Sequence, residues 1–137
     1  IRFLCENAEN LSLFSDTFDV VTISFGIRNF ENIDKGLSEC YRILKKGGSL
    51  FIMEFSTPKH KGFNILYRFY SKHILPLIGQ VISNDDKAYK YLPESIVEFN
   101  QEHKFIELLQ KSGFDSCTSV SLSNGIAHIY IGVKSKI

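Results

Sequence analysis

The most regular stretch of the chain is residues 18–55, where the spacing of apolar residues changes twice. Residues 18–25 (FDVVTISF) are rich in β-branched and aromatic residues, a composition typical of a strand covered on both faces. The next apolar positions repeat with the helical period and predict one buried face of a helix. That face consists of Ile33, Leu37, Cys40, Tyr41 and Leu44. Residues 49–55 (SLFIMEF) are apolar again and predict a second strand.

The connection between these two strands indicates where a ligand would bind. Lys45 and Lys46 fall in the last predicted turn of the helix, and Gly47 stands where a left-handed cap would end it. A strand–helix–strand crossover makes the strands parallel neighbours with a right-handed connection. In open sheets of this kind, ligands bind beyond the carboxyl ends of the strands. The unusual residues at that place are Ser24, Gly26, Arg28 and Asn29.

The regions before residue 18 and after residue 55 predict further elements. Residues 1–5 have a short apolar strand pattern, and residues 7–16 read as a polar loop. Residues 63–82 predict a helical region interrupted by Pro76 and Gly79, and a short helix begins at Pro93. A further helix follows, which Asn100 can cap and Ser112-Gly113 ends. Its inward face is Phe105, Ile106, Leu108 and Leu109.

The carboxyl-terminal pattern completes the predicted sheet. Residues 115–122 and 126–133 read as strands, and Asn124-Gly125 between them favours a tight hairpin turn. The whole pattern predicts an α/β fold in which a mostly parallel sheet is closed by an antiparallel hairpin. No domain boundary is evident within residues 1–137.

Composition narrows the class of protein only a little. Hydrophobic residues make up 44% of the 137 residues, 12 of them Phe, which favours a real core over disorder. The net charge of +1 gives no bulk field that would attract nucleic acid. The three cysteines, Cys5, Cys40 and Cys117, lack metal or redox spacing, and Cys40 falls on the buried helix face. No metal-binding motif and no hydrolytic Ser/His/Asp arrangement is present, and His128 is either a core residue or a base near the pocket.

Three segments together resemble a known enzyme family. SFGIRNF (residues 24–30), YRILKKGGSLFIMEFS (41–56) and YKYLPESI (89–96) are similar to the ubiquinone/menaquinone-biosynthesis C-methyltransferases, and the similarity runs over nearly the whole chain. The resemblance implies the Rossmann-like class I methyltransferase fold. It also implies transfer of a methyl group from S-adenosylmethionine to a ring carbon of a polyprenyl quinol. The family's glycine-rich cofactor loop and its ribose-binding acidic residue lie upstream and are absent from this sequence. We therefore expect the chain to be the carboxyl-terminal half of such an enzyme, inactive by itself.

The resemblance assigns roles to five residues near the predicted strand ends. Arg28 and Asn29 would be catalytic, with Arg28 stabilising a phenolate oxygen or orienting a water molecule and Asn29 binding the second ring oxygen. Asn7, Ala8 and Ser24 would contact the cofactor. The structural alternative for Arg28-Asn29 is a pair that caps the bend before the helix, with Arg28 on a surface carboxylate.

The substrate would be bound further along the chain. Tyr67, Tyr89 and Tyr91 are the candidates for contacting the quinol. The aromatic, basic segment 63–82 could rest on an anionic membrane surface and accept the polyprenyl tail, or it could be an ordinary core helix. The resemblance implies the matrix side of the mitochondrial inner membrane in a eukaryote and the cytoplasm in a bacterium.

Two other functions remain open from the sequence alone. The chain could belong to a methyltransferase for another lipophilic acceptor, or it could be a non-catalytic module that docks within a quinone-biosynthesis complex. The strand at residues 18–25 would leave an exposed sheet edge, so self-association is expected as well.

Overall fold

The structure is a computed structural model of the chain, and it describes residues 1–58, 62 and 102–135. These residues fall into two compact units. The first comprises 1–54, 102–120 and 129–135, and the second comprises 55–58, 62 and 121–128. The predicted helical region at 63–82, the helix expected at Pro93 and the cap expected at Asn100 lie outside the described residues.

A parallel strand–helix–strand crossover forms the first part of the chain. Strand β1 (Phe18–Ser24) pairs in parallel with β2 (Leu44–Phe55), with Ile23 opposite Ile52. Helix α1 (Ile33–Ile43) connects the two strands. Its first turn is capped by the Asn32 side chain, which accepts a hydrogen bond from the Lys35 amide at 3.0 Å. The predicted crossover and its parallel pairing are therefore confirmed.

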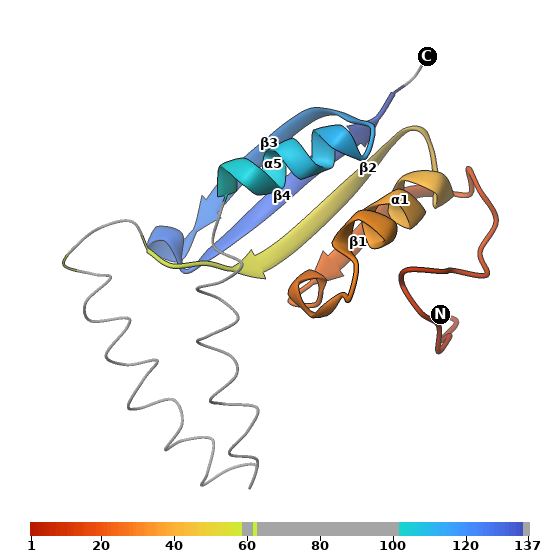
Figure 1. Cartoon of the computed structure of the whole chain (residues 1–137), viewed down its shortest axis with the longest axis horizontal. Coiled ribbons are helices and arrows are strands. Elements are labelled where there is room, and N and C mark those ends of the chain that lie inside the picture. The colour runs from red at the N-terminus through yellow and green to blue at the C-terminus, as the bar shows by residue number, and fades with distance from the viewer. Residues whose placement is uncertain (59–61, 63–101, 136–137) are drawn as a thin grey trace, which may run out of the picture. The chain divides into compact units, whose positions relative to one another are not determined.

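The predicted closing hairpin is also present. Strands β3 (Phe114–Leu122) and β4 (Ala127–Lys134) are joined by the 3₁₀ turn η3 (Ser123–Gly125). Asn124 and Gly125 both have positive φ, 55° and 90°, the conformation that these two residue types adopt most readily. The strand order is β1-β2-β4-β3, and β4 runs in the opposite direction to its neighbour β2 (Figure 1).

Helices α1 and α5 (Glu102–Lys111) lie on the same face of the sheet (Figure 1). Leu37 of α1 and Leu109 of α5 are fully buried. The Tyr41 ring of α1 meets the ring of Phe114, the first residue of β3, edge-on with centroids 5.1 Å apart. Cys40 is buried as predicted, and burial raises the pKa of its thiol to about 11, so it stays protonated at neutral pH.

Three expectations about the strands and helix ends are wrong. Residues 18–25 were expected to form a strand covered on both faces, but no residue of β1 is buried and Val20 is 52% exposed. The exposed residues Val20, Thr22 and Ser24 alternate along the strand, so one face of β1 is uncovered. Strand β1 is also an edge strand of the sheet that the structure describes.

The expected strand at residues 1–5 is absent. Ile1 and Phe3 are fully or almost fully exposed, and no strand of the described sheet pairs with this segment. A strand needs a neighbour for its N–H and C=O groups, and apolar composition alone does not supply one.

The helix also ends earlier than its pattern predicts. It stops at Ile43, and the extended residue Leu44 already begins β2, in which Lys45 and Lys46 follow. Gly47 does adopt the left-handed conformation, with φ of 77°, but it lies within β2 and does not cap the helix. The amino group of Lys134, near the end of β4, donates to the Leu44 carbonyl at 2.8 Å, so a distant strand helps to end the helix.

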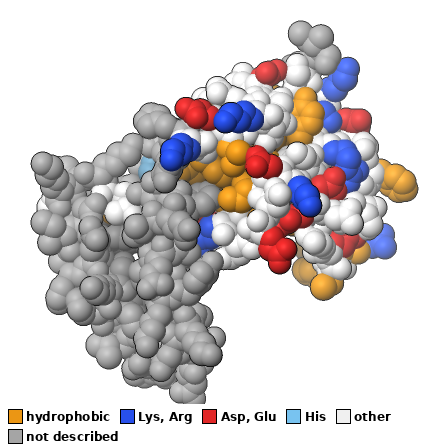
Figure 2. All heavy atoms as spheres, in the orientation of Figure 1, with side chains coloured by type: hydrophobic (Ala, Val, Ile, Leu, Met, Phe, Trp, Pro, Cys, Tyr) orange, Lys and Arg blue, Asp and Glu red, His pale blue; other side chains and the backbone are white. Residues whose placement is uncertain are grey.

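The described surface carries charges of both signs. Acidic and basic side chains alternate over the face shown in Figure 2 without separating into large patches of one sign. No helix among the described residues is long and apolar enough to cross a membrane.

Candidate active site at the carboxyl end of the first strand

The chain turns sharply where β1 ends. Phe25 has a φ of 55°, which is uncommon and strained for a bulky side chain, and its amide donates to the Met53 carbonyl at 2.8 Å. The 3₁₀ turn η1 (Ile27–Asn29) follows directly. Ile27 is fully buried and anchors this turn in the core. The backbone therefore presents Arg28 and Asn29 at the carboxyl end of β1, as the sequence predicts.

Arg28 is fixed by a buried ion pair. Its Nη1 donates to Oε1 of Glu54, the residue before the last position of β2. The side chains of Arg28 and Glu54 are only 9% and 0% exposed. The partner of Arg28 is thus a buried carboxylate. The alternative in which Arg28 and Asn29 only cap the bend required a surface carboxylate instead. A guanidinium held in this way has little freedom to reorient, which suits a role in stabilising charge at a fixed point.

Glu54 is the site residue that the sequence reasoning missed. Leu50, Ile52 and Glu54 are alternate residues of β2 and all three are buried, so Glu54 lies on the core face of the strand. A carboxylate at that position of an apolar strand costs much free energy unless a cation pairs with it. The alternation of Leu50, Ile52 and Glu54 along the strand was visible in the sequence. It would have predicted that Glu54 is buried and needs a cationic partner.

The other two predicted residues at this strand end are accessible. Asn29 and Ser24 are exposed. Ser24 lies opposite Met53 in the β1–β2 register, one residue before Glu54. The strand end therefore combines one buried, charge-paired cation with two exposed polar groups.

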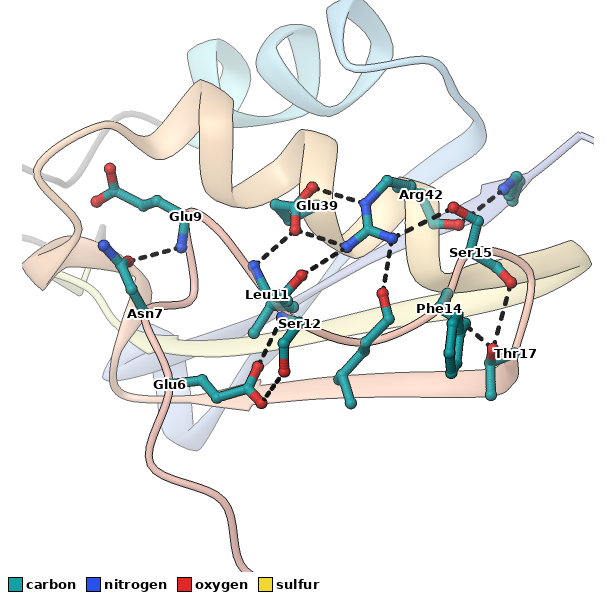
Figure 3. A network of polar contacts seen from close by, with 12 residues as sticks. Glu6, Asn7, Glu9, Leu11, Ser12, Phe14, Ser15, Thr17, Glu39 and Arg42 are labelled. Carbon is teal, nitrogen blue, oxygen red and sulfur yellow. Dashed lines mark hydrogen bonds and ion pairs between the residues drawn. The ribbon is translucent and has the colours of Figure 1, made fainter.

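The structure ties Asn7 and Ala8 to the amino-terminal end of α1. The Asn7 side chain accepts a hydrogen bond from the Glu9 amide at 2.9 Å, and the Asn10 amide donates to the Asn7 carbonyl at 3.0 Å. The Glu9 carboxylate in turn accepts from the amide of Asn32, the capping residue of α1, at 3.0 Å. The loop from Asn7 is drawn in Figure 3. The candidate substrate residues Tyr67, Tyr89 and Tyr91 lie outside the described residues.

A second polar cluster lies within the other unit. The buried Ser56 hydroxyl donates to the Gly125 carbonyl at 2.5 Å and lies 2.7 Å from Nδ1 of His128, which is also buried. Because a hydroxyl has only one proton, Nδ1 of His128 must be the donor to Ser56 Oγ. His128 is thus a core residue bonded to a side chain, and its Nδ1 is not available as a base.

Solved structures with the same fold define the class. A methyltransferase dependent on S-adenosylmethionine, possibly acting on histamine, from Thermotoga maritima matches with a TM-score of 0.66 at 23% identity, over 96% of this chain and 63% of that one. Phosphoethanolamine N-methyltransferase 2 of Haemonchus contortus, solved with S-adenosyl-L-methionine, matches with a TM-score of 0.61 at 14% identity, over 94% and 36%. The chain thus has the α/β fold of the class I methyltransferases.

The sequence identifies the family within that class. Residues 1–134 match the ubiE/COQ5 methyltransferase family, and the chain belongs to it. It is 46% identical over 129 residues to the ubiquinone/menaquinone biosynthesis C-methyltransferase UbiE of Zymomonas mobilis, covering 94% of this chain and 53% of that protein. It is 43% identical over 134 residues to the mitochondrial 2-methoxy-6-polyprenyl-1,4-benzoquinol methylase of Rattus norvegicus, covering 98% and 41%. The chain spans about half the length of the curated relatives it matches.

Proposed function

We propose that this chain supplies the carboxyl-terminal part of an enzyme that methylates a ring carbon of a polyprenyl benzoquinol or naphthoquinol, with S-adenosylmethionine as the methyl donor. Membership of the ubiE/COQ5 family supports this, as do the names of its bacterial and rat relatives. The observation that carries the proposal is the Arg28 guanidinium held by buried Glu54 at the carboxyl end of β1, because ligands bind beyond that edge in such sheets.

The residues of this chain would act mainly through charge and position. Bound S-adenosylmethionine supplies a methyl group that is already electrophilic, so the protein has to make the ring carbon electron-rich and align it. Arg28 stabilises the quinol oxygen as that oxygen passes its proton to a water molecule that Arg28 orients. Arg28 is not itself the base, because a guanidinium stays protonated. Exposed Asn29 donates a hydrogen bond to the second ring oxygen.

Three residues would contact the cofactor. Ala8 carries only a methyl side chain and follows Asn7, whose carbonyl and side chain close a turn. A small residue there lets the backbone approach the adenine ring closely. Ser24 offers an exposed hydroxyl at the end of β1. Asn7 and Ala8 would contact the adenine ring, and Ser24 would make a further contact with the cofactor. The remaining contacts would come from elsewhere in the enzyme.

The proposal also covers the substrate and the surroundings of the enzyme. Tyr67, Tyr89 and Tyr91 would contact the quinol, and the basic, aromatic segment 63–82 would rest on a membrane surface that holds the polyprenyl tail. The rat relative is named as mitochondrial, which supports the mitochondrion for a eukaryotic protein. We propose the matrix side of the inner membrane there, and the cytoplasm in a bacterium. The enzyme would work as a homo-oligomer or within a quinone-biosynthesis complex.

Methyl transfer by the complete protein tests the proposal. Labelled S-adenosylmethionine is supplied with a demethylated benzoquinol or naphthoquinol in detergent, and kcat and the cofactor KM are measured. Arg28→Lys should lower kcat about 100-fold and leave the cofactor KM within about twofold, because a lysine cannot reproduce the forked donor. Asn29→Ala should lower kcat as well, without the folding cost of changing a buried group.

Lys45→Ala is the matched control, since it removes a cation from an exposed pair with Asp19. It should retain wild-type kinetics. Cofactor binding without transfer to either quinol would refute the assigned substrate class. If the complete protein binds no cofactor, the proposed enzymatic function is refuted. The non-catalytic module that docks within a quinone-biosynthesis complex would then be favoured.

A further inference from the structure

Two side chains of α1 connect this helix to the loop that carries Asn7 and Ala8. Glu39 and Arg42 lie three residues apart on α1 and form a double ion pair. The Arg42 Nε atom donates to Glu39 Oε1 at 2.8 Å, and Nη2 donates to Oε2 at 2.7 Å. The hydrogen bond from Arg42 lowers the pKa of Glu39, and the same bond raises the pKa of Arg42. The pair is therefore fully charged at neutral pH and has a single geometry.

The remaining donors and acceptors of the pair are directed at the loop backbone. Glu39 Oε2 accepts from the Leu11 amide at 2.7 Å, and Arg42 donates to the carbonyls of Leu11 and Leu13 at 3.0 and 2.8 Å (Figure 3). Arg42 also donates to the Ser15 hydroxyl at 3.2 Å. The contacts to Leu11 and Leu13 hold the path of the loop backbone independently of the side chains there, and the Ser15 contact adds one side-chain bond.

The loop is fastened at further points around Asn7 and Ala8. The Glu6 carboxylate binds the amide and hydroxyl of Ser12, which closes the loop on itself. The Glu9 carboxylate binds the Asn32 amide at the first turn of α1. Residues 7 and 8 thus lie between two anchored positions, and a third anchor, the Glu39–Arg42 pair, holds Leu11. A single exposed ion pair contributes little to stability, whereas a bidentate pair within a network can contribute more.

We propose that Glu39 and Arg42 are positioning residues of the cofactor site, which hold the Asn7-Ala8 turn at the place where it contacts the adenine ring. The inference rests on the proposed function, since it presupposes that Asn7 and Ala8 bind the cofactor. Arginine is required at position 42, because it donates from three nitrogens in fixed directions whereas lysine donates from one. The pair acts on cofactor affinity, and it leaves the chemistry at Arg28 unchanged.

The test measures cofactor affinity and loop order in the complete protein. S-adenosylhomocysteine is the probe for calorimetric titration, and hydrogen–deuterium exchange is followed over residues 7–16. Arg42→Lys and Glu39→Ala should each weaken binding about tenfold, the loss expected when charge-assisted hydrogen bonds are broken. Exchange at Leu11 should become faster, while kcat at saturating cofactor stays within about twofold of wild type. Glu39→Gln keeps an acceptor for the Leu11 amide and should weaken binding less.

Ser38→Ala is the matched control, because Ser38 is exposed on α1 and its hydroxyl donates to the Asp34 carbonyl of the same helix. It should bind the probe like wild type. The double variant Asn7→Ala/Arg42→Lys should lose less affinity than the sum of the two single changes, since both act through one turn.

The possible failures are distinguishable. A wild-type protein that does not bind the probe overturns the proposed function, and the inference with it. If the wild type binds and the Glu39 and Arg42 variants bind equally well, only the positioning role is overturned, whether or not exchange of the loop changes. Additive losses in the double variant would also overturn it.

Discussion

At the scale of single residues, two opposing energies act on the Arg28–Glu54 pair: the cost of removing its charges from water and the attraction between them. Removing two charges from water costs several kcal/mol per ion, and their attraction offsets this only while both partners are present. Both side chains are more than nine-tenths buried. The pair is therefore better explained by the charge that it holds at the strand end than by any gain in stability.

This argument predicts opposite effects of removing one charge or both. Glu54→Gln should destabilise the chain by about 3 kcal/mol, because it removes the carboxylate charge of a buried ion pair. The double variant Arg28→Met/Glu54→Leu should recover most of that loss, since apolar side chains of similar volume need no partner. Urea unfolding followed by circular dichroism gives both values.

Asp19→Asn serves as the control in these measurements. It breaks the exposed pair with Lys45, in which Asp19 is 81% exposed, and should change stability by less than about 1 kcal/mol. A double variant as unstable as Glu54→Gln would contradict the view that the buried pair is maintained at a cost in stability.

The sequence predicted these site residues unevenly, for physical reasons. Arg28 and Asn29 were identified because they interrupt an apolar pattern at a predictable strand end. Glu54 was missed although it stands in the same pattern, because a lone acidic residue near a strand end is usually solvated. Glu39 and Arg42 could not have been predicted from periodicity, since their targets on the loop lie 27 to 31 residues away along the chain.

At the scale of elements, α1 sets the position of the active-site turn through close packing at its start. Gly36 is buried within α1, and a Cβ built there would lie only 2.3 Å from the Phe30 ring. Phe30 directly follows η1, and its amide donates to the Ile27 carbonyl at 3.2 Å. The absence of a side chain at position 36 therefore lets the helix approach the residue next to the site.

Gly36→Ala should destabilise the chain, although alanine is the better helix former. The gain in helix propensity is about 1 kcal/mol, but the new methyl group must displace the Phe30 ring, and overpacking of this kind costs about 1–3 kcal/mol. We expect a net loss of about 1–2 kcal/mol, measured by urea unfolding, and a lower kcat in the complete protein because η1 shifts with Phe30.

Phe30→Leu in the Gly36→Ala background removes the ring that the methyl group meets, and it should recover part of the lost stability. A more stable Gly36→Ala variant would show that helix propensity outweighs the packing, and would contradict the proposed contact.

The elements themselves were predicted better than their ends. The crossover strands, α5 and the hairpin follow from local patterns and were all confirmed. The end of α1 and the missing strand at residues 1–5 depend on distant partners, since Lys134 binds the Leu44 carbonyl and a strand requires a neighbour. Local sequence carries no information on either.

At the scale of the whole molecule, the two edges of the described sheet differ in character. The strand order places β1 at one edge and β3 at the other. Strand β1 reads FDVVTIS, in which four of seven residues are apolar, and β3 reads FDSCTSVSL, in which four of nine are apolar. Each strand has one exposed valine, Val20 at 52% and Val120 at 47%. An apolar, unprotected edge is a site for pairing with another chain. The β1 edge is therefore the better candidate for self-association.

We predict that the 137-residue chain self-associates through β1 and that Val20→Lys lowers the association constant by at least about tenfold. A charged side chain on an edge strand opposes pairing with a second edge, and the substitution buries nothing in the monomer because Val20 is exposed. Sedimentation equilibrium over a range of concentrations measures the constant.

Val120→Lys is the control on the opposite edge, where Val120 is 47% exposed, and it should associate like the unchanged chain. A chain that stays monomeric at every concentration, or one that only Val120→Lys dissociates, would contradict the assignment to β1. The contrast matters for the site as well, because η1 directly follows β1 and any chain paired with that edge would lie beside Ser24 and Asn29.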